Sequence, residues 1–323
     1  MGKKVRICFH DRCFDGTASA AVFSRFYREC IDPAAELCYA GLVHLPAGGR
    51  LDDGILDGDE NVIVDFKYSP SPRLTWWFDH HQSAFLVPED AEHFKRDTSG
   101  KKFYDPAYKS CTKFLAQVAG EKFGFRAESL AELIHWADII DGAQYESPEA
   151  AVTMNVPATQ VALVIEASSD DQMTRRLIGE ITANASLVEL ARLPYVASEF
   201  NRLYARHQDS VQVLSKHAEY ERRVIYFDIA DYSLEGYNKF IPYSLYPDCL
   251  YSVGVSRSPQ RIKVAVGSNP WQRLPPGRDK NLACLCERHG GGGHARVAAI
   301  SYAPGDLEKA RRAAREIAKE LRK

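Results

Sequence analysis

Phe78-Asp79-His80-His81 ends an apolar run, residues 74–78, that is typical of a buried β-strand. Three ligand-capable side chains at one strand end are unusual, and neighbouring residues on an extended chain point to opposite faces. His80 and His81 can therefore do different work, one on a metal ion and the other on a substrate. For the triplet alone, a surface loop with two solvated histidines is the alternative interpretation.

Two further apolar runs end on ligand-capable side chains. Asp65 follows Val-Ile-Val at residues 62–64, and the run at residues 5–9 is followed by His-Asp-Arg-Cys-Phe-Asp-Gly at residues 10–16. Ligands of open α/β sheets bind at the carboxyl ends of the strands, so these segments predict a shared site along one edge of a parallel sheet. Carboxylates and imidazoles suit divalent cations, and paired cations hydrolyse phosphate esters. A single strand-end Asp is otherwise often a turn residue or a helix cap.

Asp15 and Gly16 lie between the first strand and a helix that is predicted to begin near Thr17. Gly16 permits a tight turn and a close backbone approach, and the N-terminus of the helix favours a nearby anion. The simpler interpretation is that Asp15 only caps this helix.

The segment at residues 135–141 reads His-Trp-Ala-Asp-Ile-Ile-Asp, with His135, Asp138 and Asp141 at regular spacing. Residues three apart share a helix face, so either Asp138 or Asp141 is a candidate ligand for a second metal ion. The other Asp is expected to be structural or a cap.

The segment at residues 288–296 reads Arg-His-Gly-Gly-Gly-Gly-His-Ala-Arg. Consecutive glycines expose backbone N–H groups, so this loop can wrap a phosphate or a base, and Arg296 adds positive charge. A flexible linker is the alternative, but a linker rarely lies between a helix and a buried strand.

Composition narrows the class of protein. A chain of 323 residues favours two domains, and its net charge of −2 argues against a generic duplex-DNA-binding protein, which is strongly basic. The 8 cysteines form no CxxC pair and are expected to be reduced thiols. The N-terminus lacks a signal-peptide core, and no run approaches the roughly 20 apolar residues of a membrane span, so a cytoplasmic protein is expected.

Strand-like and helix-like runs alternate over residues 1–150, which predicts an α/β fold with a doubly wound, mostly parallel sheet and flanking helices. Residues 251–255 and 261–266 flank a short loop and predict a hairpin. The predicted organisation is a metal-binding domain at 1–195, a helical linker at 196–223 and a smaller α/β domain at 224–323, with a cleft between the domains. Trp76 and Trp77 are expected to pack in the core rather than to stack on bases.

Together these segments resemble the DHH phosphoesterase superfamily, and the glycine run resembles its DHH-associated C-terminal domain. The matching segments cover most of the chain, at residues 10–21, 62–65, 78–81, 138–141 and 253–299. The family includes single-strand exonucleases, oligoribonucleases, nucleotide phosphatases and pyrophosphatases. The resemblance implies a metal-dependent phosphoesterase that hydrolyses a nucleotide or a short oligonucleotide through water activated by two metal ions.

The resemblance also implies a role for each residue. Asp65 would bridge two metal ions, His81 would contact the scissile phosphate, and one of Asp138 and Asp141 would help to hold the second ion. The candidate metal ligands are His10, Asp11, Cys13, Asp15, Asp65, Asp79, His80, Asp138 and Asp141; the candidate catalytic residues are Asp79 and His81; the candidate substrate-binding residues are Arg257, Gly291, Gly292, Gly293, His294 and Arg296.

The first metal site departs from the family pattern. Many members have a His four residues before an Asp, whereas here Cys13 stands in the place of that Asp and His10 precedes it by three residues. Another branch uses Asp-x-Asp-x-Asp-Gly, with which Asp11, Cys13 and Asp15 align. The ligands could therefore be His10 or Asp11, with or without Cys13. Two divalent cations are expected, Mn²⁺ or else Mg²⁺, and a Cys13 thiolate would favour Zn or Fe.

A second departure leaves the substrate open. Ser268 and Asn269 stand where many relatives have an arginine-containing signature. The expected partner is a phosphorylated small molecule or a short oligonucleotide, and a homodimer is left open. A pyrophosphatase or polyphosphatase, and a nucleotide-binding regulatory module with a weakened metal site, are the alternative functions.

Overall fold

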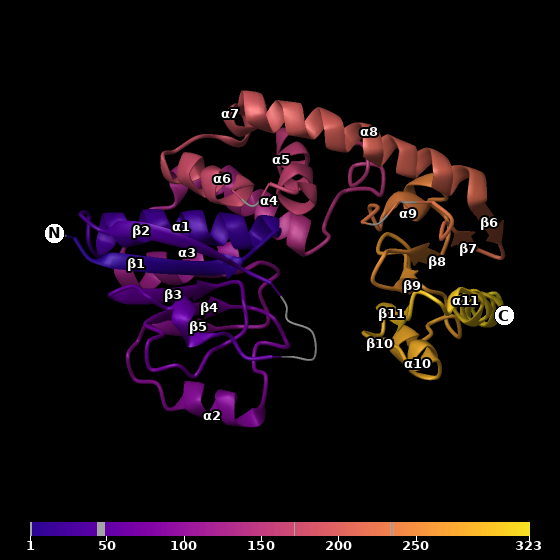
Figure 1. The fold of residues 1–323 in the computed structure, drawn as a ribbon, viewed down its shortest axis with the longest axis horizontal. Helices are drawn as coiled ribbons and strands as arrows, with labels where there is room; N and C mark the ends of the chain where they lie inside the picture. The colour runs from indigo at the N-terminus through magenta and orange to yellow at the C-terminus, as the bar shows by residue number, and fades with distance from the viewer. Residues whose placement is uncertain (1, 44–48, 171, 233, 235) are drawn as a thin grey trace. The chain divides into compact units, whose positions relative to one another are not determined.

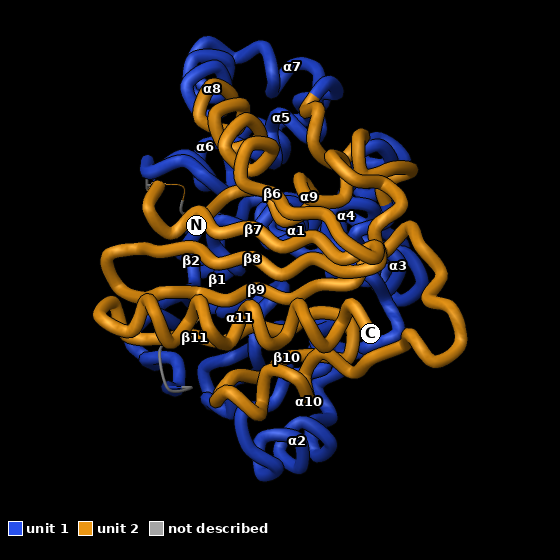
Figure 2. The backbone as a smooth tube through the Cα atoms, turned by 90° about the vertical axis from the view of Figure 1, so that its right-hand side faces the viewer, with its two compact units in different colours: residues 1–144, 155–203 blue, residues 145–154, 204–323 orange. Residues whose placement is uncertain are grey.

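The computed structural model describes residues 2–43, 49–170, 172–232, 234 and 236–323. The chain forms two compact units, coloured separately in Figure 2: unit 1 comprises residues 1–144 and 155–203, and unit 2 comprises residues 145–154 and 204–323. Helix α8, Pro194–His217, runs through most of the segment that the sequence predicts as a helical linker. The cleft that the sequence predicts between two domains stays a prediction.

Unit 1 is built on a five-stranded sheet in the order β2-β1-β3-β4-β5. All four strand pairs are parallel, as the alternating pattern predicted. The strands are β1 Lys4–His10, β2 Glu36–Leu42, β3 Glu60–Val64, β4 Trp76–Asp79 and β5 Lys102–Tyr104.

Helices and loops cover both faces of this sheet. The helices of unit 1 are α1 Phe14–Cys30, α2 Pro88–Lys95, α3 Cys111–Phe123, α4 Ala131–Asp141, α5 Pro157–Ala167, α6 Met173–Thr182 and α7 Leu187–Arg192, with short 3₁₀ helices at Asp53–Ile55 and Glu128–Leu130. The α/β fold with flanking helices that the sequence predicts is therefore confirmed (Figure 1).

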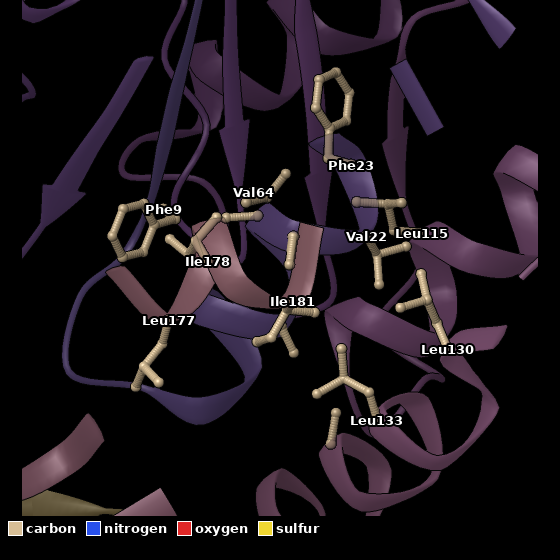
Figure 3. Packing of buried hydrophobic residues seen from close by; sticks show 14 of the residues in the cluster. Phe9, Val22, Phe23, Val64, Leu115, Leu130, Leu133, Leu177, Ile178 and Ile181 are labelled. Atoms are coloured by element: carbon tan, nitrogen blue, oxygen red, sulfur yellow. The ribbon is translucent and has the colours of Figure 1, made fainter. Parts of the chain in front are cut away.

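Strand alternation divides the core of unit 1 into two layers. Phe9 and Val64 point into the layer beneath α1, where they meet Val22 of that helix, Leu115 of α3 and Ile178 of α6 (Figure 3). The residues between them on the same strands point into a second layer on the opposite face. Because both faces are apolar, the strands read as continuous hydrophobic runs rather than as alternating ones.

The second layer is dominated by aromatic rings around Trp77, which is 0% exposed. Its ring centroid lies 4.8 Å from that of Tyr68 and 5.2 Å from that of Phe94, and its Nε1 donates to the carbonyl oxygen of Phe66 at 2.9 Å. Trp76, 1% exposed, packs in the opposite layer. Both tryptophans are core residues, as the sequence predicted.

Unit 2 contains a six-stranded mixed sheet in the order β10-β11-β9-β8-β7-β6. Its strands are β6 Ala218–Glu221, β7 Val224–Asp228, β8 Tyr251–Arg257, β9 Ile262–Ser268, β10 Gly292–Gly293 and β11 Val297–Tyr302, and its helices are α9 Ile241–Leu245, α10 Leu282–Glu287 and α11 Leu307–Leu321. The antiparallel pairing of β8 with β9 confirms the predicted hairpin. Helix α11 lies along β8 and β9 and buries its apolar stripe against them (Figure 2).

Within the described part of the chain, no helix is both long enough and apolar enough to cross a membrane.

Trp77→Ala is expected to lower the free energy of unfolding of unit 1 by about 3–5 kcal/mol, because a large cavity would remain among rings that cannot collapse. Urea unfolding followed by circular dichroism measures the change. Val43→Ala is the control, since Val43 belongs to the same unit but is 58% exposed, and it should cost less than about 0.5 kcal/mol. Equal losses in the two variants would show that the Trp77 layer contributes no special stability.

Candidate metal centre

Three neighbouring strands end at the same edge of the sheet. In the parallel pairing Phe9 lies opposite Val64, and Val64 lies opposite Phe78. The next residues along each strand are therefore His10, Asp65 and Asp79. The gathering that the three sequence segments predict is present in the structure.

Asp65 lies at the centre of this edge, with 1% of its surface exposed. Its Oδ2 is 3.4 Å from His10 Nδ1 and 3.6 Å from Cys13 Sγ. Its Oδ1 is 3.4 Å from His80 Nε2 and 3.8 Å from His81 Nδ1. The backbone has φ +56°, a left-handed conformation that Asp adopts more readily than most residues. Each oxygen of this carboxylate therefore faces a different group of donors.

A further group of donors surrounds His80. Its Nε2 lies 3.6 Å from Asp15 Oδ2 and 3.4 Å from Asp141 Oδ2. The three donor atoms are within 4.8 Å of one another, and the same is true of one donor atom each from His10, Cys13 and Asp65. Asp65, His80 and His81 form another such group, so the described residues contain three overlapping groups of potential metal ligands.

Asp15 is fixed by the first turn of α3. Its Oδ2 accepts from the backbone N–H of Cys111 at 2.6 Å, and its Oδ1 accepts from that of Thr112 at 3.0 Å. Asp15 belongs to α1, which begins at Phe14 and not near Thr17 as the sequence predicted. A Cβ at Gly16 would collide with the carbonyl oxygen of His10, so glycine is required for this close approach.

Hydrogen bonds also orient the two histidines of the motif. His80 Nδ1 lies 3.2 Å from the carbonyl oxygen of Tyr108, and donation to it leaves Nε2 directed at the acids. Asp79 Oδ1 accepts from His81 Nδ1 at 2.7 Å and from the backbone N–H groups of His80 and His81 at 2.8 and 3.2 Å. Asp79 therefore contacts His81 and lies outside all three groups of potential ligands among the described residues.

Two other predicted ligands also lie outside these groups. Asp11 Oδ1 accepts from Thr174 Oγ1 at 2.9 Å and from the backbone N–H of Arg12 at 2.9 Å. Asp138 Oδ2 accepts from Lys113 Nζ at 2.7 Å. The geometry thus favours Asp141 over Asp138, an alternative that the sequence left open.

The site carries more negative charge than its buried position accommodates without cations. Burial and the carboxylates of Asp65 and Asp141 raise the pKa of Asp15, and burial and Asp65 raise the pKa of Asp141 to about 6. Burial would lower the pKa of His80, but Asp65 and Asp15 outweigh burial and raise it to about 10. Burial would raise the pKa of Asp65, but the His10 and His80 imidazoles outweigh burial and hold that pKa below its ordinary value.

Buried polar atoms that lack a hydrogen-bond partner indicate whether these residues fit metal ions. Among the described residues, Asp65 Oδ1 and His80 Nε2 are buried without a hydrogen-bond partner. Buried polar atoms of this kind need a partner, and carboxylate oxygens with imidazole nitrogens are ligands of Mn²⁺, Mg²⁺ and Zn²⁺. The donor set fits divalent cations, and Asp65 is a member of two of the three groups and lies 3.4 Å from His80 of the third.

Several backbone N–H groups of the glycine loop in unit 2 form hydrogen bonds within that unit, whereas the sequence predicted that the loop exposes them to a ligand. The N–H groups of Gly290, Gly291 and His294 donate to Glu287, Cys286 and Val297 carbonyl oxygens, so they are engaged within the unit. A Cβ at Gly291 or Gly293 would collide with the backbone of β11, whereas one at Gly292 meets nothing within 4 Å.

The remaining predicted substrate-binding residues are on the surface of unit 2. Arg257 ends β8 and is exposed, as are His294 and Arg296. Asn269 is different, since its Nδ2 donates to the carbonyl oxygens of Pro247 and Cys249 at 3.1 and 2.9 Å. Asn269 therefore braces the backbone at residues 247–249.

Sequence reasoning missed the backbone groups of the site, namely the N–H groups of Cys111 and Thr112 and the carbonyl of Tyr108. Ser110 provided a partial signal, because a serine before an apolar helical run is a typical N-cap, and its side chain does accept from Lys113 N at 3.3 Å. That signal locates the start of a helix but does not say which carboxylate it faces.

Mn²⁺ is expected to raise the melting temperature of the metal-free protein, because it binds the folded state. At a concentration about 100 times its Kd, each bound ion adds about 2.7 kcal/mol. Asp65→Asn and Asp141→Asn should diminish the rise, and Asp138→Asn should keep it. Differential scanning calorimetry measures the three variants beside the parent chain. A similar loss in Asp138→Asn would place Asp138 among the ligands.

No protein-family model matches the chain, and no curated protein sequence matches it. Solved structures do resemble it. A pGpG-specific phosphodiesterase, PggH from Vibrio cholerae, superimposes with a TM-score of 0.71 at 18% identity, covering 99% of each chain. The DHH domain of a member of the S1p family of ribosomal proteins gives 0.61 at 12% identity, covering 98% of this chain and 87% of that one.

RecJ from Thermus thermophilus in complex with Mn²⁺ gives a TM-score of 0.52 at 14% identity. The match covers 99% of this chain and 52% of RecJ, so the chain spans about half the length of that protein. At these identities the likeness establishes the fold. The chain therefore has the two-unit α/β fold that the resemblance to DHH proteins implies.

Proposed function

We propose that the chain is a metal-dependent phosphoesterase that hydrolyses a phosphodiester in a nucleotide or a short oligonucleotide. One observation carries the proposal: both oxygens of the buried Asp65 carboxylate face separate groups of donor atoms. This is the arrangement that a carboxylate shared by two cations requires. Divalent cations bound there would neutralise phosphate charge and activate water.

The residues around the ions have distinct tasks in this proposal. His10 and Cys13 would hold one ion and Asp15, His80 and Asp141 the other, with Asp65 shared. Backbone N–H groups from α3 keep the Asp15 carboxylate in position, so little reorganisation is needed when an ion binds.

His81 is the residue best placed to act on the phosphate. Its Nδ1 is engaged with Asp79 Oδ1 at 2.7 Å, which fixes the ring and directs Nε2 away from Asp79. Burial opposes protonation of His81, but Asp79 and Asp65 raise its pKa above the ordinary value. A protonated Nε2 would donate to a phosphate oxygen and stabilise charge that develops during attack. Asp79 acts through His81 and is a positioning residue.

A linear dinucleotide is the first substrate to test. The similar structure from Vibrio cholerae is a pGpG-specific phosphodiesterase, and its match extends over 99% of both chains. RecJ structures of the same fold hold Mn²⁺ or Mg²⁺, which supports these ions as the first cofactors to supply. In unit 2, the exposed side chains of Arg257, His294 and Arg296 and the open surface at Gly292 are the candidate groups for contacts with a nucleotide or an oligonucleotide.

Asp65→Asn and Asp79→Asn are each expected to lower kcat for pGpG by about 100-fold or more, because each removes a group needed in the transition state. Asp65→Asn should also weaken Mn²⁺ binding, whereas Asp79→Asn should not. Turnover of pGpG and of bis-p-nitrophenyl phosphate with Mn²⁺, beside calorimetric metal titration, separates the two roles. The control is Asp209→Asn on an exposed position of α8. Near-full activity in either site variant would remove that residue from the proposal.

Gly292→Val and Arg296→Ala are expected to raise KM for a short oligonucleotide by about tenfold, or about 1.4 kcal/mol, with little change for bis-p-nitrophenyl phosphate. Gly292 tolerates the larger side chain sterically, since an added Cβ meets nothing within 4 Å. Gly305→Val is the matched control, because Gly305 is equally open but lies in the turn before α11. Equal losses on both substrates would place the loop in the chemical step or in folding.

A further inference from the structure

We propose that the two metal sites differ in chemistry, so that the site at His10 and Cys13 takes a softer ion such as Zn²⁺, Fe²⁺ or Co²⁺ and the site at Asp15 and Asp141 takes Mn²⁺ or Mg²⁺. The centre would then be heterodinuclear, with Asp65 contacting both ions. The inference rests on the proposed function only in taking this cluster as a dinuclear metal centre.

The thiol of Cys13 is directed at the shared carboxylate. Its Sγ lies 3.6 Å from Asp65 Oδ2, the same oxygen that lies 3.4 Å from His10 Nδ1. One sulfur, one nitrogen and one oxygen thus converge within 4.8 Å. Asp65 is 1% exposed, so this oxygen has little access to water that would replace a ligand.

Cys13 occupies a position where its side chain would ordinarily serve the helix. It is the N-cap residue of α1, with an extended backbone at φ −127° and ψ 131°, and N-caps are usually Ser, Thr, Asp or Asn because their oxygens accept from the helix. Here the side chain makes no capping hydrogen bond. The thiol is therefore available for the group of donors at Asp65 and is not required by α1.

No nearby carboxylate replaces Cys13 in this group. Asp11 is the candidate closest in sequence, but its Oδ1 is engaged with Thr174 Oγ1 at 2.9 Å and with the backbone N–H of Arg12. Among the described residues, Asp11 also belongs to no group of potential ligands. Without Cys13, the described members of this group would be His10 and Asp65.

The donor atoms of the two sites select different ions. An imidazole, a thiolate and a carboxylate with a position left for water or substrate form a ligand set that suits Zn²⁺, and thiolates favour soft ions generally. The other site offers oxygens of Asp15, Asp65 and Asp141 with the single nitrogen of His80. An oxygen-rich set of this kind suits Mn²⁺ and Mg²⁺.

Cobalt substitution tests the assignment directly. The protein is stripped of metal with a chelator, checked for folding by circular dichroism and titrated with Co²⁺. A near-ultraviolet sulfur-to-cobalt charge-transfer band is expected in the parent chain and should be absent in both Cys13→Ser and Cys13→Asp. Cys13→Asp should still bind two equivalents. Cys13→Ser should weaken one of them by about tenfold or more, since even changes behind a ligand cost about 10–100-fold.

Two further variants locate the band. Cys284→Ser removes an exposed cysteine of unit 2 and should keep it. Asp141→Asn should lose affinity for one equivalent and also keep it, because Asp141 lies in the other group. Exposure of the stripped protein to one equivalent of Zn²⁺ with Mn²⁺ in large excess should yield one of each in the parent chain, measured by mass spectrometry, and Cys13→Asp should shift the content toward Mn²⁺, because Mn²⁺ competes with Zn²⁺ only in excess.

The inference is overturned if the parent chain shows no charge-transfer band, if the band survives in Cys13→Ser, or if Zn²⁺ and Mn²⁺ fill both sites without preference. These readouts do not depend on turnover. A chain that shows the band but hydrolyses no phosphodiester would contradict the proposed function alone, and a chain that hydrolyses but lacks the band would contradict the inference alone.

Discussion

The carboxylate of Asp65 is the group on which the rest of the centre depends. It is buried at a strand end, and burial alone would raise its pKa. The imidazoles of His10 and His80 outweigh burial and lower that pKa. Its two oxygens face different donors, because Oδ2 lies near His10 and Cys13 and Oδ1 lies near His80 and His81. A different side chain at this one position would leave these residues facing one another without the charge that organises them.

The parallel register of the backbone brings these residues to the same edge of the sheet. Strands β1, β3 and β4 are adjacent and end level with one another, so His10, Asp65 and Asp79 leave the sheet at the same height. Large aromatic rings fill the layers on both faces of these strands, including Trp76 and Trp77. Dense packing resists sliding of one strand past another, because a shift would open cavities among rings that have no alternative fit. The core thereby maintains the positions of the ligands.

The sequence predicts the fold and the location of the centre better than it predicts individual contacts. Buried strands, their polar ends and the β8–β9 hairpin are local patterns, and parallel strands then place the polar ends together without further information. Which of Asp138 and Asp141 faces the centre depends on how α4 rotates against α1 and α3, and no spacing along the chain encodes that. The role of Asp79 is also hard to predict from the sequence, because its hydrogen bond with His81 depends on the turn after β4. The sequence predicts the start of α1 too late along the chain, because its N-cap, Cys13, is not one of the residue types that usually cap a helix.

Asp15 serves two structures at once. It belongs to the first turn of α1 and also accepts the N–H groups of Cys111 and Thr112, so it satisfies the start of α3 in the way that a capping residue usually does from within its own helix. The start of α3 and one group of potential metal ligands therefore share a residue. Loss of metal and fraying of α3 should be coupled events, and any redesign of the centre that replaces Asp15 must supply a new acceptor for α3. The residues of the centre are therefore constrained by the architecture as well as by the chemistry.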